Sequence, residues 1–145
     1  MKTVYLIGNI NNQTLEECGK WRIDAEYIFK QAGLDVINPM NWAKNGIECE
    51  IKENRMVDPP EYSGLIVGMS EWAVSQSDVL FGKLSADGGW GTPMEICQAR
   101  REYSIPVIGW GLDPGDDING WILEYVNYFC MNMENAADKV IGLFG

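Results

Sequence analysis

The chain has 145 residues, of which 46% are hydrophobic and 22% are charged, a composition typical of a single globular domain spanning residues 1–145. Its net charge of -10 disfavours nucleic acid and anionic membranes as main partners, because both would be repelled. The sequence contains no histidine, which excludes Ser-His-Asp and Cys-His catalysis and leaves carboxylates as the most plentiful reactive groups.

The first part of the chain is predicted to be a strand, a helix and a strand, followed by a long loop. Residues 3–7 form an apolar run that predicts a buried strand and is too short for a signal peptide or a membrane span. A Thr-x-x-Glu signature at residues 14–17 starts an amphipathic helix that ends at Gly33, and residues 34–37 form the second strand. Residues 40–61 have weak periodicity and many charges, so we expect a long loop with one helical turn at most, of a length typical of lids and interfaces.

The rest of the chain continues the alternation of helices and strands. The pattern predicts strands at residues 78–82, 106–110 and 128–131. It predicts helices before, between and after them, at residues 60–77, 92–103 and 119–125 and from Asn135 onward. Apolar strands without alternation indicate a parallel sheet of about five strands covered by helices on both faces, which is a three-layer α/β sandwich. Ligands bind such sheets outside the carboxyl ends of the strands.

The cysteines give no sign of a structural cross-link. Cys18, Cys49, Cys97 and Cys130 are scattered, without any Cys-x-x-Cys pair. Since the chain carries no secretory signal, we expect reduced thiols in the cytoplasm rather than disulfides or a zinc site.

A glycine-rich loop, Gly88-Gly89-Trp90-Gly91, precedes the helix predicted at residues 92–103. It lacks the spacing of the dinucleotide-binding G-x-G-x-x-G motif and of the Walker A motif, so neither a nicotinamide nor a nucleoside triphosphate is indicated. Its glycines would let the backbone approach a ligand closely, and the N–H groups at the start of the helix would point outward.

Glu95 can be interpreted in two ways. If Thr92 caps the helix, Glu95 is the third helical residue and the partner of a capping box, which contributes about 1 kcal/mol. The positive end of the helix dipole would also hold the pKa of its carboxyl group down, which suits a nucleophile. Ionised carboxylates attack acetal-like carbons in retaining glycoside cleavage. The spacing alone favours the structural interpretation.

Several runs of residues resemble the nucleoside 2-deoxyribosyltransferase family, in the right order and over nearly the whole chain. They are TVYLIG at residues 3–8, NPM at 38–40, SDVL at 77–80, and GTPMEICQA at 91–99 followed by PVI at 106–108. The resemblance implies a flavodoxin-like fold, a homodimer or higher homo-oligomer, and cleavage of N-glycosidic bonds without a metal or organic cofactor. It makes Glu95 the nucleophile, which expels the base and passes the sugar to another base, or to water in the related nucleotide N-hydrolases.

The resemblance assigns roles to four further residues. Tyr5 matches an aromatic residue near the nucleophile, with a core tyrosine as the alternative. Asn119 matches an asparagine that reaches a neighbouring subunit's site and contacts the sugar 5′-hydroxyl, with a helix cap as the alternative. Arg22 matches an arginine near a phosphate or carboxylate, with a solvated helix arginine as the alternative. Asp78 begins a strand and is expected to support the site.

The chain departs from the family at two acidic positions. The aspartate that helps to protonate the leaving base is replaced by Ser70, and the neighbouring Glu71 would point about 100° away on a helix. A second aspartate, or a serine in the N-hydrolases, is replaced by Gly89, and Asp87 could take its sugar-binding role only if the loop folds back. The sequence therefore leaves the protonation of the base unassigned.

The remaining predicted contacts are with the substrate. The predicted binding residues on the rim are Gly8, Asn9, Asp87, Gly89, Trp90, Gly91 and Met94. Trp42, Trp90 and Trp110 lie near predicted rim loops and offer stacking faces for a base, although core packing is the commoner use of tryptophan. We expect base exchange on nucleosides with a 5′-hydroxyl. The alternatives are a nucleotide N-hydrolase, a non-catalytic nucleotide-binding module, and a partner-binding protein on the same scaffold.

Overall fold

The computed structural model describes residues 1–45, 50–58, 60–86, 91–113 and 115–145. Its main sheet consists of β1 (Thr3–Ile7), β2 (Asp35–Ile37), β5 (Val79–Lys83), β6 (Val107–Trp110) and β7 (Tyr128–Cys130). The helices are α1 (Trp21–Gln31), α2 (Ser63–Gln76), α3 (Gly91–Glu102), α4 (Gly120–Tyr125) and α5 (Met133–Phe144).

The five strands form one parallel sheet in the order β2-β1-β5-β6-β7. The predicted three-layer flavodoxin-like α/β arrangement is therefore confirmed. The strands are the apolar runs of the sequence, and side chains of β1 alternate between the two faces of the sheet. Val4 and Leu6 enter one buried cluster, whereas Tyr5 and Ile7 enter the other.

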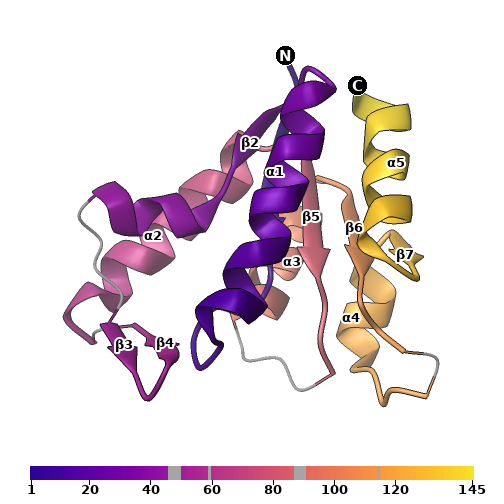
Figure 1. Cartoon of the computed structure of the whole chain (residues 1–145). Helices are drawn as coiled ribbons and strands as arrows, with labels where there is room; N and C mark the ends of the chain where they lie inside the picture. The colour runs from indigo at the N-terminus through magenta and orange to yellow at the C-terminus, as the bar shows by residue number, and fades with distance from the viewer. Residues whose placement is uncertain (46–49, 59, 87–90, 114) are drawn as a thin grey trace.

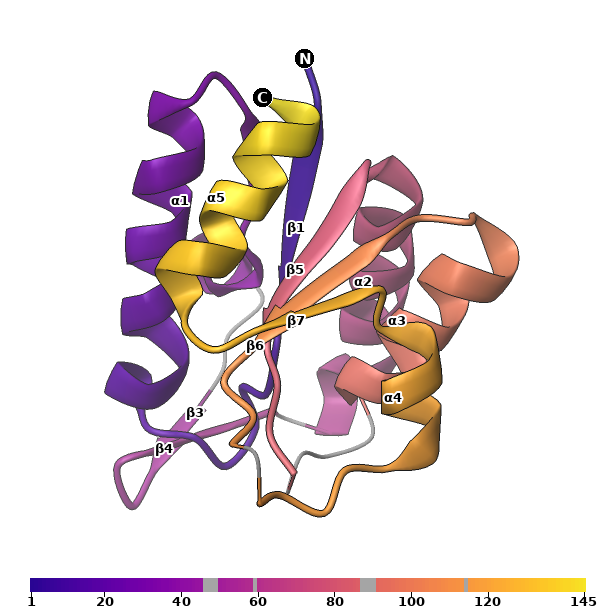
Figure 2. The same ribbon diagram turned by 90° about the vertical axis from the view of Figure 1, so that its right-hand side faces the viewer.

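Helices cover both faces of the sheet (Figures 1 and 2). On one face, α1 and α5 pack together over the cluster that includes Phe29, Phe81 and Val140. On the other face, α2, α3 and α4 enclose the cluster that includes Ile96 and Val126. This arrangement places Tyr5 beneath α2 and α3, which is why its side chain can meet a residue of α3.

The segment predicted as a loop over residues 40–61 is more regular than expected. It begins with a 3₁₀ segment (Pro39–Asn45) and continues into an antiparallel hairpin of β3 (Glu50–Lys52) and β4 (Arg55–Val57). Each strand has only three residues, too few to give a periodic signal. Figures 1 and 2 show the hairpin at the end of the molecule opposite the two chain termini.

Three predicted helix starts can be compared with the structure. The Thr14 hydroxyl accepts a hydrogen bond from the Glu17 N–H at 3.1 Å, which confirms the first start, although a π-helical turn (Glu16–Lys20) precedes α1. The terminal helix begins at Met133 rather than Asn135, because the Asn132 side chain caps it. The third start is wrong in detail: α3 begins at Gly91, so Thr92 is already helical and is not the cap.

Three of the cysteines, Cys18, Cys97 and Cys130, are free thiols, and Cys49 lies outside the described residues. Within the described ranges, no helix is long and apolar enough to cross a membrane. The same residues contain no group of three or more cysteine or carboxylate side chains placed to hold a metal ion.

Candidate active site

A cavity of about 460 Å³ opens at the carboxyl end of β1, which is the position where ligands bind sheets of this strand order. In the sheet, β1 lies between β2, which follows it in the chain, and β5. The loops that follow neighbouring strands therefore run to opposite faces of the sheet and leave a crevice between them. The side chains that line it come from β1 and the loop after it, from α1, from residues 39–58, from α2 and from the start of α3.

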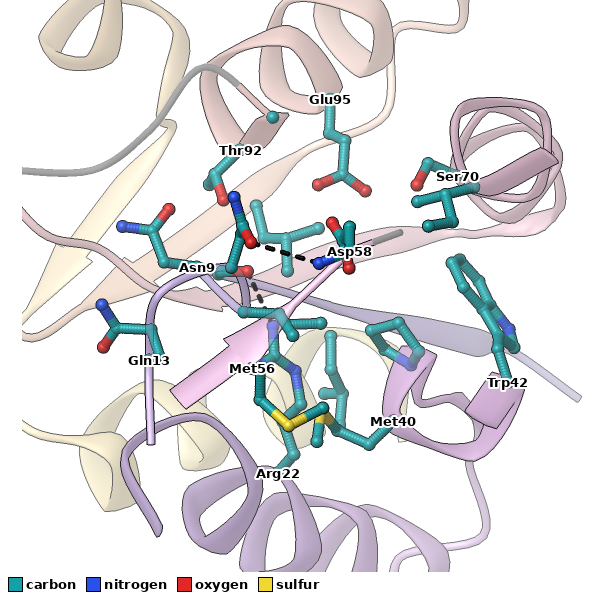
Figure 3. A pocket seen from close by; sticks show the side chains of 18 of the residues that line it. Asn9, Gln13, Arg22, Met40, Trp42, Met56, Asp58, Ser70, Thr92 and Glu95 are labelled. Carbon is teal, nitrogen blue, oxygen red and sulfur yellow. Dashed lines mark hydrogen bonds between the residues drawn. The ribbon is translucent and has the colours of Figure 1, made fainter. Parts of the chain in front are cut away.

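Glu95 and Tyr5 form the centre of this cavity. Tyr5 lies in β1 with 2% of its surface exposed, and its hydroxyl donates a short hydrogen bond to the Glu95 carboxylate. Glu95 is the fifth residue of α3, so its side chain leaves the first turns of the helix and points into the cavity (Figure 3). The carboxylate therefore faces the cavity and bonds to a side chain from the sheet, 90 residues away in sequence.

The ionisation of Glu95 differs from the sequence-based expectation. Burial raises the pKa of its carboxyl group to about 7, while the hydrogen bond from Tyr5 and the charge of Arg22 act in the opposite direction. The helix dipole was expected to hold this pKa down, and that expectation is wrong, because burial outweighs it. Burial and the nearby carboxylate raise the pKa of Tyr5, so its phenol remains a proton-bearing hydrogen-bond donor.

Arg22 is fully buried beside the cavity, with 0% of its surface exposed, so the alternative of a solvated helix arginine is wrong. Its guanidinium group donates to the Cys18 carbonyl at 2.7 Å and to the Gly8 carbonyl at 2.9 Å. Gly8 has φ of +147°, and a Cβ there would lie 3.1 Å from the Lys83 carbonyl oxygen. Arg22 thus fixes the turn that leads from β1 into the wall of the cavity.

Ser70 and Trp42 approach Tyr5 from the sides. The Ser70 hydroxyl, from α2, hydrogen-bonds the Tyr5 phenol and lowers its pKa, although burial outweighs this effect. The Trp42 ring stacks on the Tyr5 ring, with centroids 6.4 Å apart and an interplanar angle of 26°. Both residues line the cavity, so Trp42 offers a face to a planar ligand there.

Asp58 also lines the cavity, although sequence reasoning did not select it. It follows β4 directly, and its carboxyl group lies in the space into which Glu95 points (Figure 3). The only signal for it in the sequence was the unusual length of the segment at residues 40–61, which predicted a functional role for the segment without naming a residue.

The other predicted site residues are distributed as follows. Gly8, Asn9 and Gly91 line the cavity that holds Glu95. Met94 and Asn119 instead line a second cavity of about 490 Å³, between α3 and α4.

The side chain of Asn119 caps α4 by accepting a hydrogen bond from the Trp121 N–H at 2.8 Å. The helix cap, offered as the alternative for this residue, is therefore present. Its predicted role in a neighbouring subunit's site stays a prediction.

Two acidic candidates lie away from the cavity. The Glu71 carboxylate is exposed and accepts a hydrogen bond from Gln98 at 3.4 Å, so it does not substitute for the aspartate missing at Ser70. Asp78 lies at the amino end of β5 and accepts from the Thr3 N–H at 2.8 Å. The strands are parallel, so Asp78 lies at the opposite end of the sheet from Glu95. The predicted role of Asp78 in supporting the site therefore does not come from a direct contact with Glu95.

Three predicted binding residues, Asp87, Gly89 and Trp90, lie outside the described residues. Trp110 packs edge-on against Trp21, with ring centroids 5.7 Å apart, and so serves the core.

The comparisons with known proteins give structural matches only. No protein family model matches the chain, and no curated protein matches it. A 2-deoxyribosyltransferase from Bacillus psychrosaccharolyticus is similar in structure, with a TM-score of 0.65 and 19% identity over 94% of this chain and 90% of that one. A conserved protein from Enterococcus faecalis V583 has a TM-score of 0.69 and 17% identity over 99% of both chains. A CMP N-glycosidase from Clostridium botulinum has a TM-score of 0.60 and 17% identity over 99% of this chain and 100% of that one.

At these identities the likeness shows the fold. The family resemblance noted in the sequence is thus confirmed at the level of architecture: the chain has the flavodoxin-like α/β fold of a 2-deoxyribosyltransferase and of a CMP N-glycosidase.

Proposed function

We propose that this protein cleaves the N-glycosidic bond of a nucleoside and transfers the sugar to another base through a covalent ester on Glu95. The observation that carries the proposal is the Glu95 carboxylate, bonded to Tyr5 and facing a cavity at the point where this fold binds ligands. The similar structures of a 2-deoxyribosyltransferase and a CMP N-glycosidase support the same reaction class.

The chemistry follows from the environment of Glu95. In the first step the ionised carboxylate forms a bond to C1′ of the sugar while the C1′–N bond breaks, and the electrons of that bond stay with the base, which takes up a proton. Tyr5 donates to the carboxylate and so orients it, while the buried charge of Arg22 favours the ionised form. In the second step a nitrogen of the acceptor base attacks C1′, loses its proton, and releases the carboxylate.

The pKa of about 7 sets the expected pH dependence of the first step. About half of the Glu95 carboxyl groups are ionised at neutral pH, so the ionisation of Glu95 should make the rate rise as pH increases through 7. A nucleophile held with a low pKa would show no such rise in that range.

The polar lining favours a neutral sugar over a phosphate. Four residues with amide side chains line the cavity after β1: Asn9, Asn11, Asn12 and Gln13. Amides donate and accept hydrogen bonds and suit sugar hydroxyls. Among the described lining residues, the one cation is Arg22, and two main-chain carbonyls already engage its guanidinium. We therefore expect nucleosides to be better substrates than their 5′-monophosphates.

The experiment is a base-exchange assay with Glu95→Gln. The protein is incubated with mixed deoxynucleosides and a free acceptor base, and the products are separated by chromatography. We expect exchange by the natural protein, a loss of activity of at least about 10⁴-fold in Glu95→Gln, and a sugar adduct on Glu95 in mass spectrometry. Glu102→Gln, an exposed position on the same helix, is the matched control and should keep full activity. Full exchange by a folded Glu95→Gln protein would refute the proposal.

The same assay separates the alternatives. A nucleotide N-hydrolase, favoured by the likeness to a CMP N-glycosidase, would release free base from nucleoside monophosphates without an acceptor. A non-catalytic nucleotide-binding module, favoured by Ser70 in place of an aspartate, would be stabilised thermally by nucleosides without releasing any base.

A further inference from the structure

The cavity that holds Glu95 is lined by a second carboxyl group, that of Asp58. Among its described lining residues, the carboxylic acids are Glu95 and Asp58. They come from different parts of the fold, since Glu95 lies on α3 and Asp58 follows β4. Paired carboxyl groups that flank a cavity are the arrangement by which glycosidic bonds are broken, one acting as nucleophile and the other transferring a proton.

Contacts with the loop after β1 fasten the hairpin to the cavity. The Asn12 N–H donates to the Met56 carbonyl at 2.8 Å, and the Met56 N–H donates to the Gln13 carbonyl at 2.8 Å. The Asp58 N–H itself donates to the Asn11 side-chain oxygen at 3.3 Å (Figure 3). Met56 is 5% exposed and lines the same cavity, so β4 is packed against the wall of the site.

The other polar groups near Glu95 are poorly suited to protonating a base. The Tyr5 hydroxyl already donates a hydrogen bond to Glu95, and its pKa is raised, so it is a weak acid. The Ser70 hydroxyl is engaged with Tyr5, and an aliphatic hydroxyl is a far weaker acid than a carboxyl group. Arg22 is held by two carbonyls beneath the turn.

We propose that Asp58 is the catalytic acid and base of this site, which protonates the leaving base and takes the proton back from the incoming one. The inference rests on the proposed function. In this proposal two residues act on the base: Trp42 supplies a stacking face, and Asp58 supplies the proton.

The step is balanced as follows. Glu95 forms its bond to C1′ while the C1′–N bond breaks, and the Asp58 carboxyl transfers its proton to the base, which leaves neutral. Asp58 is then a carboxylate. When an acceptor base or water attacks C1′ and releases Glu95, Asp58 accepts the proton that the attacking group loses.

The test compares Asp58→Asn on two substrates that differ in their need for a proton. One is 2′-deoxyguanosine, and the other is 7-methyl-2′-deoxyguanosine, whose base is already cationic and leaves without protonation. If the protein takes only pyrimidines, the pair is 2′-deoxyuridine and its 5-nitro derivative, which is a better leaving group. We expect Asp58→Asn to lose on the order of 10²-fold or more in kcat on the natural nucleoside and less than about threefold on the activated one.

Asp58→Glu keeps a carboxyl group on a longer side chain and should recover part of the lost rate. Asp138→Asn, an exposed position on α5, makes the same chemical change on the other face of the sheet and should leave both rates unchanged. Thermal unfolding of each variant establishes that it is folded. Because the readout is the ratio of two rates on one protein, a uniform loss of folded protein cancels.

The following outcomes would overturn the inference. Equal losses on both substrates would make Asp58 a binding or structural residue, and unchanged rates on both would leave it without a role in the reaction. If Glu95→Gln is inactive while Asp58→Asn is fully active, only the inference on Asp58 fails. If the natural protein cleaves no nucleoside at all, the proposed function fails and Asp58 loses its role with it.

Discussion

At the scale of single residues, the site depends on a carboxyl group that burial makes costly to ionise. Burial raises the pKa of Glu95 to about 7 from a reference value of 4.5, despite the hydrogen bond from Tyr5 and the charge of Arg22. The folded protein therefore keeps a proton on Glu95 over a pH range in which the unfolded chain has lost it. A nucleophile placed this way is ready to react at neutral pH but destabilises the fold there.

This gives a prediction for stability. Since the folded state binds more protons between pH 4.5 and 7, the free energy of unfolding should fall as pH rises through this window, by up to about 3 kcal/mol from this residue. Glu95→Gln removes the titrating group, so the variant should be more stable than the natural protein at pH 8 and lose that advantage near pH 4.5. Urea denaturation at the two pH values measures the difference.

Glu102→Gln, the exposed control on α3, should follow the natural protein at both pH values. Parallel stability curves for Glu95→Gln and the natural protein would show that the pKa of Glu95 is not raised in the folded state.

At the scale of elements, the hairpin β3–β4 was the part that the sequence predicted least well. Strands of three residues give no period to detect, and the hairpin is held by main-chain contacts to the loop after β1, more than 40 residues earlier in the chain. Glu95 shows a related limit. Thr-x-x-Glu correctly indicated a helix start, but whether the glutamate turns back to the helix end or towards Tyr5 depends on β1, which is distant in sequence.

The hairpin offers a prediction at this scale. The exposed Arg55 donates to the Asn12 carbonyl at 2.6 Å and so helps to fasten β4 to the wall of the cavity. Arg55→Ala should raise KM by up to about tenfold, as expected for the loss of one charged hydrogen bond of about 1.5 kcal/mol. Steady-state kinetics of base exchange measure the effect.

Arg101→Ala removes the same charge from an exposed site on α3, where the side chain donates to the Tyr125 hydroxyl at 3.1 Å, and should leave KM unchanged. An equal rise in both variants would trace the effect to net charge rather than to the hairpin.

At the scale of the whole molecule, the architecture was the most predictable feature. The strands of its main sheet are apolar runs separated by helices, and these properties are local in sequence. The burial of Arg22 was not predictable in the same way, because it arises only when α1 packs on the sheet and encloses the guanidinium. Resemblance to a family supplied Glu95 and Tyr5, whereas Asp58 became visible only in three dimensions.

The net charge of -10 gives a prediction at this scale. The field of the protein repels a nucleoside 5′-monophosphate and hardly affects a neutral nucleoside, and salt screens it as the Debye length falls from about 30 Å at 0.01 M to about 8 Å at 0.15 M. Raising the salt concentration over this range should therefore increase kcat/KM for the monophosphate relative to the nucleoside. A ratio of the two kcat/KM values that does not change with salt would contradict this.

The residues of the proposed site come from four separate stretches of the chain: Tyr5 from a central strand, Arg22 from a helix on one face, Asp58 from the end of the hairpin and Glu95 from a helix on the other face. No fragment shorter than residues 5–95 contains all four, so we expect no turnover from a short peptide cut from the protein. Enzymatic turnover would then report on the completeness of folding, and it should vanish on heating together with the near-ultraviolet circular dichroism of the packed tryptophans.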